Sequence, residues 1–377
     1  MSAETGSATQ PVTPAPFDHR CYVPILLTRQ GERHALRVTA PTVRSSLRPL
    51  FVVQPVATDP RTGAFKMTVE QHLDKLAREL PKDWGLGPAF VDLRWVDTSQ
   101  PMSDGSHAIE RFVSRCETSG LKLAPAISTS HAATYRAAAV SAANNVGTTL
   151  CLRLSPDEWY DLGTPVGNGR VLGLLAETGR PATNVHVILD FEDQITATTS
   201  LALAAVRPAL QSLPQAHDWA SVTVAGTGMP VGTADVGRND SAELPRLEWA
   251  LWQLLNGTGY RRPSFGDYGV QHPDPQSDFN PLYMDSSAQL RYTVGQSWFV
   301  ARGQGVKKVG NDQIRGLAQQ VVGHAEYSGA QFSWGDQWLS ECASATCSPG
   351  AQGVWRKVTT NHHLSFVVNQ LANFVGP

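Results

Sequence analysis

Three carboxylates lie close together near the middle of the chain. Asp190, Glu192 and Asp193 follow an apolar run that begins at Val185. If β-strand alternation continues this far, Asp190 and Glu192 face one side and Asp193 faces the other. Together with Asp92, which lies in an earlier apolar run, Asp190 and Glu192 could hold a magnesium ion or serve as acid and base. The alternative is one structural carboxylate paired with an arginine, while the others are solvated.

Three arginines occupy similar points in other apolar runs. If Arg94, Arg153 and Arg302 all point inward, they form a positively charged mouth that suits phosphate or carboxylate. The glycine-rich turns at residues 226–228 and 302–305 add backbone N–H groups that can bind phosphate, although glycine is also common in turns for conformational reasons alone. In the competing interpretation, the arginines and aspartates pair with each other in a structural polar layer.

Eight short apolar runs alternate with segments of helical periodicity. Apolar residues are nearly continuous within each run, as in parallel strands that are buried on both faces. The pattern predicts an α/β fold, a single TIM-like (β/α)8 barrel whose ligands bind at the C-terminal mouth. An open doubly wound sheet would be favoured by a Gly-x-Gly-x-x-Gly turn after the first strand, which is missing there. The predicted strands are residues 50–56, 90–96, 121–128, 148–154, 185–191, 221–225, 264–270 and 298–301.

The chain divides into three predicted parts. Residues 1–20 are expected to be a disordered leader, residues 21–330 the barrel, and residues 331–377 a C-terminal appendage that packs on the barrel or covers one mouth. Residues 21–49 precede the counted strands and are expected to add a short strand at residues 22–27 and a helix. Three tryptophans in the appendage suggest a protein-interaction surface.

Composition narrows the classes of function. The chain is 41% hydrophobic and 17% charged, too apolar for global disorder, and its net charge of -2 argues against general polyanion binding. Without a signal peptide or an apolar run near 18 residues, we expect a cytoplasmic protein with no membrane partner. The odd number of cysteines indicates reduced thiols; the alternatives for Cys342 and Cys347 are a local disulfide or half of a metal site with His362 and His363. No strong catalytic motif is present in the sequence.

Short motifs along most of the chain resemble the beta-protein family of bacteriophages and bacteria. They are Tyr-Val-Pro-Ile-Leu (22–26), Arg-Pro-Leu-Phe (48–51), Gly-Asp-Tyr-Gly followed by His-Pro (266–273), Leu-Arg-Tyr-Thr (290–293), Arg-Gly (302–303), and Trp-Arg with a downstream His-His (355–363). The resemblance implies a phage-related or mobile-element context and supplies no catalytic residues. It adds these candidate ligand-binding residues to Arg94 and Arg153: Asp267, Tyr268, Arg291, Tyr292, Arg302 and His363.

Three functions remain open at this point. The leading hypothesis is a barrel protein of phage–host conflict, or anti-phage defence, that binds an anionic, phosphate-bearing small molecule or nucleotide at its C-terminal mouth. The second is a metal-dependent phosphodiesterase or nuclease with Asp190, Glu192 and Asp92 as catalytic residues, the only case that implies a magnesium cofactor. The third is a protein-interaction module that uses the aromatic C-terminal tail. The sequence does not decide whether the protein is an enzyme.

Overall fold

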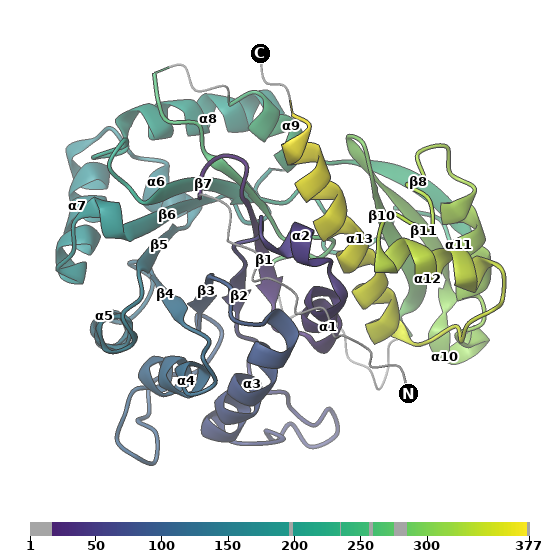
Figure 1. Cartoon of the computed structure of the whole chain (residues 1–377), viewed down its shortest axis with the longest axis horizontal. Helices are drawn as coiled ribbons and strands as arrows, with labels where there is room; N and C mark the ends of the chain where they lie inside the picture. Colours follow the sequence, from purple (N-terminus) through teal and green to yellow (C-terminus); the bar gives the residue numbers. More distant parts are fainter. Residues whose placement is uncertain (1–16, 196–198, 234, 256–258, 275–284, 375–377) are drawn as a thin grey trace, which may run out of the picture.

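The computed structural model describes residues 17–195, 199–233, 235–255, 259–274 and 285–374. Eight parallel strands close into a barrel, with helices arranged around it, so the predicted (β/α)8 fold is confirmed (Figure 1). The barrel strands, in order around the sheet, are β1 (Tyr22–Leu27), β2 (Leu50–Val52), β3 (Ala89–Asp92), β4 (Leu123–Ile127), β5 (Leu150–Leu154), β6 (Val185–Asp190), β7 (Ser221–Gly226) and β9 (Ser264–Asp267).

Two strand predictions were wrong, one at each end of the count. The segment at residues 22–27, which the prediction does not count among the eight barrel strands, is the first of them and pairs with both β2 and β9. Residues 298–301 are not the eighth barrel strand, because they lie within an antiparallel hairpin of β10 (Ser287–Val294) and β11 (Ser297–Gly305). The two-residue link Gly295–Gln296 between two apolar runs is a hairpin signal, which the strand count overlooked. The barrel sheet therefore ends at β9, well before residue 330.

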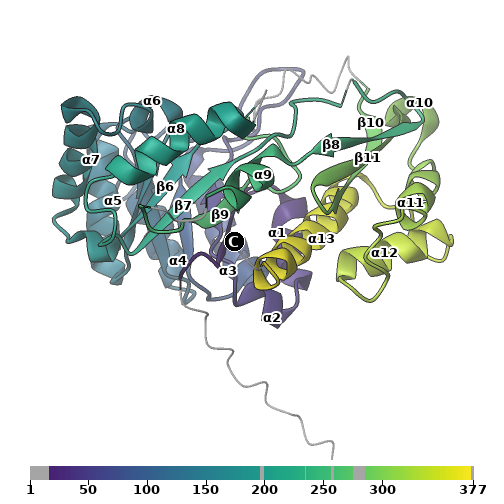
Figure 2. The same ribbon diagram turned by 90° about the horizontal axis from the view of Figure 1, so that it is seen from above.

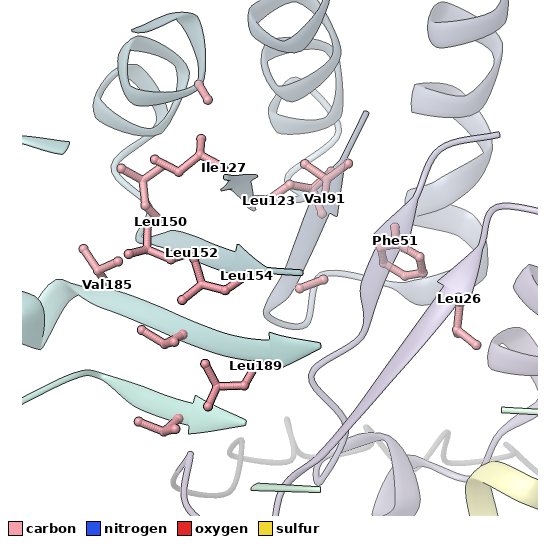
Figure 3. Close-up of a cluster of buried hydrophobic side chains, with 14 of the residues drawn as sticks. Leu26, Phe51, Val91, Leu123, Ile127, Leu150, Leu152, Leu154, Val185 and Leu189 are labelled. Carbon is pink, nitrogen blue, oxygen red and sulfur yellow. The ribbon is translucent and has the colours of Figure 1, made fainter. Parts of the chain in front are cut away.

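Helices cover the outside of the sheet. Their apolar sides and the outward side chains of the strands form one continuous core, part of which is shown in Figure 3. Side chains at alternate strand positions, such as Ile25, Phe90 and Ile188, fill the barrel interior. The helices that follow β1 to β7 are α1 (Gln30–Val38), α2 (Pro41–Arg44), α3 (Val69–Trp84), α4 (Ala108–Glu117), α5 (Ala133–Val146), α6 (Pro156–Trp159), α7 (Pro165–Thr178), the 3-10 turn η1 (Ala182–Asn184), α8 (Thr199–Ser212) and α9 (Leu247–Gln253).

A second, smaller unit is inserted into the barrel topology, and we call it the insert. Its three-stranded antiparallel sheet has the order β10-β11-β8, where β8 (Asp240–Pro245) comes from the segment between β7 and α9. The insert helices α10 (Val306–Val309), α11 (Ile314–Val322) and α12 (Trp334–Ala343) follow the hairpin. Figure 2 shows the insert on the opposite side of the last helix, α13 (Gln352–Ala372), from the barrel.

Helix α13 takes the position of the eighth barrel helix. It packs on α1, β1 and β10, and its side chains belong to two hydrophobic cores: Leu364 and Val367 to the barrel core, Trp355 and Val358 to the insert core. The predicted appendage at residues 331–377 therefore contains a helix that completes the barrel's helical layer. Residues 1–16 and 375–377 lie outside the described residues, while Phe17, in the predicted leader, stacks on His186 at a centroid distance of 5.0 Å.

Three consecutive polar residues of α13 connect it to three neighbours. Asn361 donates to Thr39 Oγ1 beside α1 at 3.0 Å, and it accepts from the Gly335 N–H of α12. His362 bonds Asp336 of the insert at 2.9 Å. His363 bonds Asp267 of β9 at 2.9 Å and Thr293 of β10 at 2.7 Å. Burial lowers the pKa of the His363 imidazole, so the ring is neutral and its Nε2–H donates to the Asp267 carboxylate.

The helices and the cysteines bear on two further expectations. None of their helices combines the length and apolar character that a membrane span requires. Cys342 and Cys347 are free thiols, and His362 and His363 have partners elsewhere, so the alternatives of a disulfide and a shared metal site are not realised. The cytoplasmic location stays a prediction.

We expect His363→Ala to destabilise the fold by about 3 kcal/mol, because it leaves the buried Asp267 carboxylate without one of its charge-assisted hydrogen bonds. Urea denaturation followed by circular dichroism measures this change. The matched control is His217→Ala, which removes an exposed imidazole and should change stability by less than about 0.5 kcal/mol. Equal effects of the two substitutions would contradict the structural role of His363.

Candidate functional site

A buried arginine organises the C-terminal mouth of the barrel. Arg153 points inward from β5 and is 2% exposed. Its guanidinium donates to Asp190 Oδ2 at 2.9 Å, to Asp92 Oδ2 at 2.8 Å and to the Tyr268 hydroxyl at 2.8 Å. Burial raises the pKa of Tyr268 well above its ordinary value, so its hydroxyl stays protonated and donates to Asp190 at 2.7 Å. Four of the predicted site residues therefore meet, and they form the structural polar layer of the competing interpretation.

Asp92 also bonds two groups nearer the opening. Arg94 donates to Asp92 Oδ2 at 2.9 Å, and His131 lies 3.1 Å from Asp92 Oδ1. Because the Ser128 N–H donates to His131 Nδ1, the neutral imidazole carries its proton on Nε2, which faces Asp92. Burial alone would raise the pKa of Asp92, but Arg94, His131 and Arg153 outweigh that effect and hold it well below its usual range.

Glu192 has an unusual backbone conformation for a residue with a side chain. Its φ is 54°, its N–H donates to Asp190 Oδ1 at 2.8 Å, and its carbonyl accepts from Thr227. Its side chain bonds Arg94 at 2.8 Å, while burial, with Asp190 as a smaller cause, raises its pKa. Strand β6 ends at Asp190, so alternation does not continue beyond it, and Asp193 lines the same cavity as Glu192. The expectation that Asp193 faces the other side was wrong.

A cavity of 430 Å³ opens above this polar layer, and we call it the acidic cavity. Carboxylates from the end of β6 and from the segment after β9 line it beside two arginines and two histidines. The side chains that matter here are Arg94, Trp95, His131, Arg153, Glu192, Asp193, Tyr268, His272 and Asp274.

A second cavity of 360 Å³ adjoins the first, since His272 and Asp274 line both. Arg29 follows β1, Arg291 lies in β10 and Arg356 lies in the first turns of α13, and all three line this second cavity. We call it the arginine cavity. Its other lining groups are mostly neutral and polar, among them Ser286, Ser287, Gln289, Gln352 and Thr359.

Among the described residues, Arg291 and Arg356 have few counter-charges of their own. Arg291 donates to the Val270 carbonyl at 2.9 Å, and burial, followed by repulsion from Arg356 and Arg29, lowers its pKa to about 10. Burial also lowers the pKa of Arg356, whose Nε is buried without a hydrogen-bond partner. Among the described residues, no carboxylate lies within salt-bridge distance of Arg291 or Arg356. The cavity therefore concentrates positive charge that an anion would neutralise.

Several predicted site residues lie elsewhere. Arg302 donates to the carbonyls of Thr233 and Val236 in the insert, so it does not join the mouth and that prediction was wrong. Tyr292 bonds Asp336 inside the insert core. Asp267 and His363 bond each other, with Tyr22, between the sheet and α13 rather than inside the barrel. Tyr292, Asp267 and His363 therefore have structural contacts and do not line either cavity.

The sequence argument missed Arg29 and Arg356 for identifiable reasons. Arg29 lies two residues beyond the end of β1, a position that indicates a mouth residue once that strand is counted. Arg356 and Arg29 lie near opposite ends of the sequence. The packing of α13 on α1 brings the two side chains to one cavity.

The predicted metal site does not fit the side chains. Asp92 and Asp190 are bound by Arg153, and Glu192 by Arg94. Across the described residues, no group of three or more His, Cys, Asp or Glu side chains is arranged to hold a metal ion. We therefore derive no metal-dependent step.

A buried carboxyl behind the arginine cavity gives a pH-dependent prediction. Glu32 of α1 is 1% exposed, its oxygens have no hydrogen-bond partner, and burial raises its pKa to about 7 against the opposing effect of Arg29 and Arg356. Because the native state binds this proton more tightly than the unfolded state, the stabilisation is complete below about pH 4.5 and is lost as pH rises through about 7.

We expect Glu32→Gln to raise the free energy of unfolding by up to about 3 kcal/mol at pH 8 relative to the parent, with the difference shrinking toward pH 5. Urea denaturation at pH 5, 6, 7 and 8 measures it. Glu117→Gln, which replaces an exposed glutamate, is the matched control and should give a pH-independent difference near zero. A Glu32→Gln difference that does not change with pH would contradict the assigned proton.

The family model described as "Beta protein" matches residues 22–369, nearly the whole chain, and no match was found among curated proteins. Among solved structures, the chain is similar to a mutant tryptophan synthase alpha-subunit from Pyrococcus furiosus, with 10% identity, a TM-score of 0.37, and coverage of 67% of this chain and 88% of that one. It is also similar to triosephosphate isomerase from Bartonella henselae, with 13% identity, a TM-score of 0.34, and coverage of 66% and 92% respectively.

These structural similarities are too distant to carry a functional argument, and the family match is the informative result. It agrees with the motifs in the sequence and extends over both the barrel strands and the insert. The chain belongs to the beta-protein family.

Proposed function

We propose that this protein binds a small molecule carrying a phosphate or a comparable anion, and that the arginine cavity holds the anionic group. The observation that supports this most strongly is the convergence of Arg29, Arg291 and Arg356 on one cavity at the C-terminal face. The leading hypothesis from the sequence is kept in this form, but with a different set of arginines. A role in phage–host conflict is part of the proposal and rests on the family resemblance.

The charges and donors of the arginine cavity suit an oxyanion. A guanidinium offers several N–H groups in a planar fork, which matches phosphate geometry. Burial is the main cause of the lowered pKa of Arg291, and repulsion from Arg356 and Arg29 lowers it further; a bound dianion would offset that repulsion. The N-terminus of α13 also borders the cavity through Gln352, and its Ala351 N-cap forms no side-chain cap, so the positive end of the helix dipole adds to the field.

The acidic cavity is a poorer place for an anion. The positive charges of Arg94 and Arg153 are already balanced by Asp92, Asp190 and Glu192. Asp193, half-exposed, adds a further negative charge at the opening. An anion would therefore be repelled from the acidic cavity and attracted to its neighbour.

The two alternative functions have less support from the geometry. The metal-dependent hydrolase requires Asp92 and Asp190 to be available, whereas Arg153 binds both. The interaction module requires an exposed aromatic tail, whereas Trp338 and Trp355 are buried in the insert core.

We expect Arg356→Gln to weaken the binding of inorganic phosphate by about 10- to 100-fold, the effect of losing one charge-assisted contact. Isothermal titration calorimetry at low and at physiological salt measures this, and affinity should fall as salt rises. Arg291→Gln should act in the same direction. Arg78→Gln, which replaces an exposed arginine of α3, is the matched control and should bind like the parent. Phosphate binding that is absent in the parent, or unaffected in Arg356→Gln, would exclude the proposal.

A further inference from the structure

The two adjoining cavities have opposite charge, which restricts the kind of molecule that can occupy both. We infer that the ligand is dipolar: a phosphorylated amine whose phosphate lies in the arginine cavity and whose ammonium lies in the acidic cavity. This inference rests on the proposed function and adds the chemical class of the ligand to it.

The acidic cavity has an excess of negative charge. Its lining holds the carboxylates of Glu192 and Asp193 and the guanidiniums of Arg94 and Arg153, and the buried Asp92 and Asp190 lie directly behind them. These four carboxylates exceed the two guanidiniums by two. Asp274 lines both cavities and is not counted for either. A cationic group would reduce this imbalance, whereas a neutral group would leave it unchanged.

His272 lies where the cavities meet and has an unused polar group. Its side chain is 10% exposed and lines both cavities. Its Nδ1 accepts from the Asp274 N–H, so the neutral ring carries its proton on Nε2. That nitrogen lies 3.3 Å from Asp193 Oδ2, yet it is buried without a properly oriented hydrogen bond. A buried N–H without a partner is costly, and a ligand that extends from one cavity to the other could satisfy it.

Two further features of the acidic cavity suit an ammonium. Trp95 lines it and is 37% exposed, so its ring offers a face for a cation–π contact. Two hydrogen bonds hold the Glu192 backbone in the left-handed conformation. Its N–H donates to Asp190, and its carbonyl accepts from the Thr227 N–H. Such a conformation is unfavourable for a residue with a side chain and is typical of functional positions. It presents the Glu192 carboxylate at the opening, where only Arg94 contacts it among the described residues.

The opposite charges also fix the direction of the ligand. A phosphate in the acidic cavity would face Glu192 and Asp193, and an ammonium in the arginine cavity would face three guanidiniums. Both placements are repulsive, so reversed binding is disfavoured at each end.

The test uses three series of synthetic phosphates with chains of two to six carbons: ω-aminoalkyl, ω-hydroxyalkyl and n-alkyl phosphates. Calorimetry on the full-length protein, with inorganic phosphate as competitor, gives the affinity of each. At the best chain length, we expect the amine to bind at least tenfold more tightly than the alkyl phosphate of equal length, and more tightly than the alcohol.

Variants test whether the tighter binding of the amine depends on the acidic cavity. Asp193→Asn and Glu192→Gln should each reduce the advantage of the amine at least threefold without weakening the binding of inorganic phosphate. Arg356→Gln should weaken all three series together. Asp97→Asn, an exposed aspartate after β3 that lines neither cavity, is the matched control and should leave every affinity unchanged.

The possible results separate this inference from the proposed function. If the series compete with phosphate but the amine has no advantage at any length, or the alcohol binds equally well, the ligand is not dipolar and the arginine cavity remains an anion site. If the amine advantage persists in both carboxylate variants, the assignment to the acidic cavity is wrong. If nothing competes with phosphate because phosphate does not bind, the proposed function fails, and this inference fails with it.

Discussion

The guanidinium of Arg153 lies inside a closed barrel, where water hardly reaches it, and a group that is always charged must be paired there. Asp92 and Asp190, at the ends of β3 and β6, and Tyr268, directly after β9, supply that pairing. The pairing also determines what the mouth can do. Because the two aspartates are bound to Arg153, they are not available for a metal ion, and the charges nearer the opening come from residues beyond the strand ends. The anion site that we propose consequently lies in the neighbouring arginine cavity.

The second constraint is the position of α13. Asn361, His362 and His363 connect this helix to α1, to the insert and to the barrel sheet. The same helix carries Arg356, and the hairpin on which it packs carries Arg291. The polar contacts of α13 therefore position two of the three arginines, although none of the connecting residues lines the cavity. The structural contacts and the proposed ligand contact thus lie on successive turns of one helix.

The sequence was sufficient for the barrel and for the convergence of Asp92, Arg153 and Asp190, because parallel strands place their C-terminal ends at one mouth. The sequence did not predict the position of Arg302 correctly, because a hairpin strand and a barrel strand have similar apolar runs and differ in the turn that follows. It also missed Arg29 and Arg356, whose proximity depends on packing between the first and last helices. Local patterns thus predict which residues end a strand, whereas contacts between distant segments cannot be derived from them.

The central claim is that the C-terminal face has one cavity for an anion and that its guanidiniums belong to Arg29, Arg291 and Arg356. The most direct measurement is the anomalous scattering of tungstate, a phosphate analogue, in crystals of the full-length protein. We predict a tungstate peak within hydrogen-bonding distance of Arg291 and Arg356, and no peak at that position in Arg356→Gln crystals. Tungstate bound beside Arg94 in the acidic cavity, or no ordered tungstate on this face, would contradict the account.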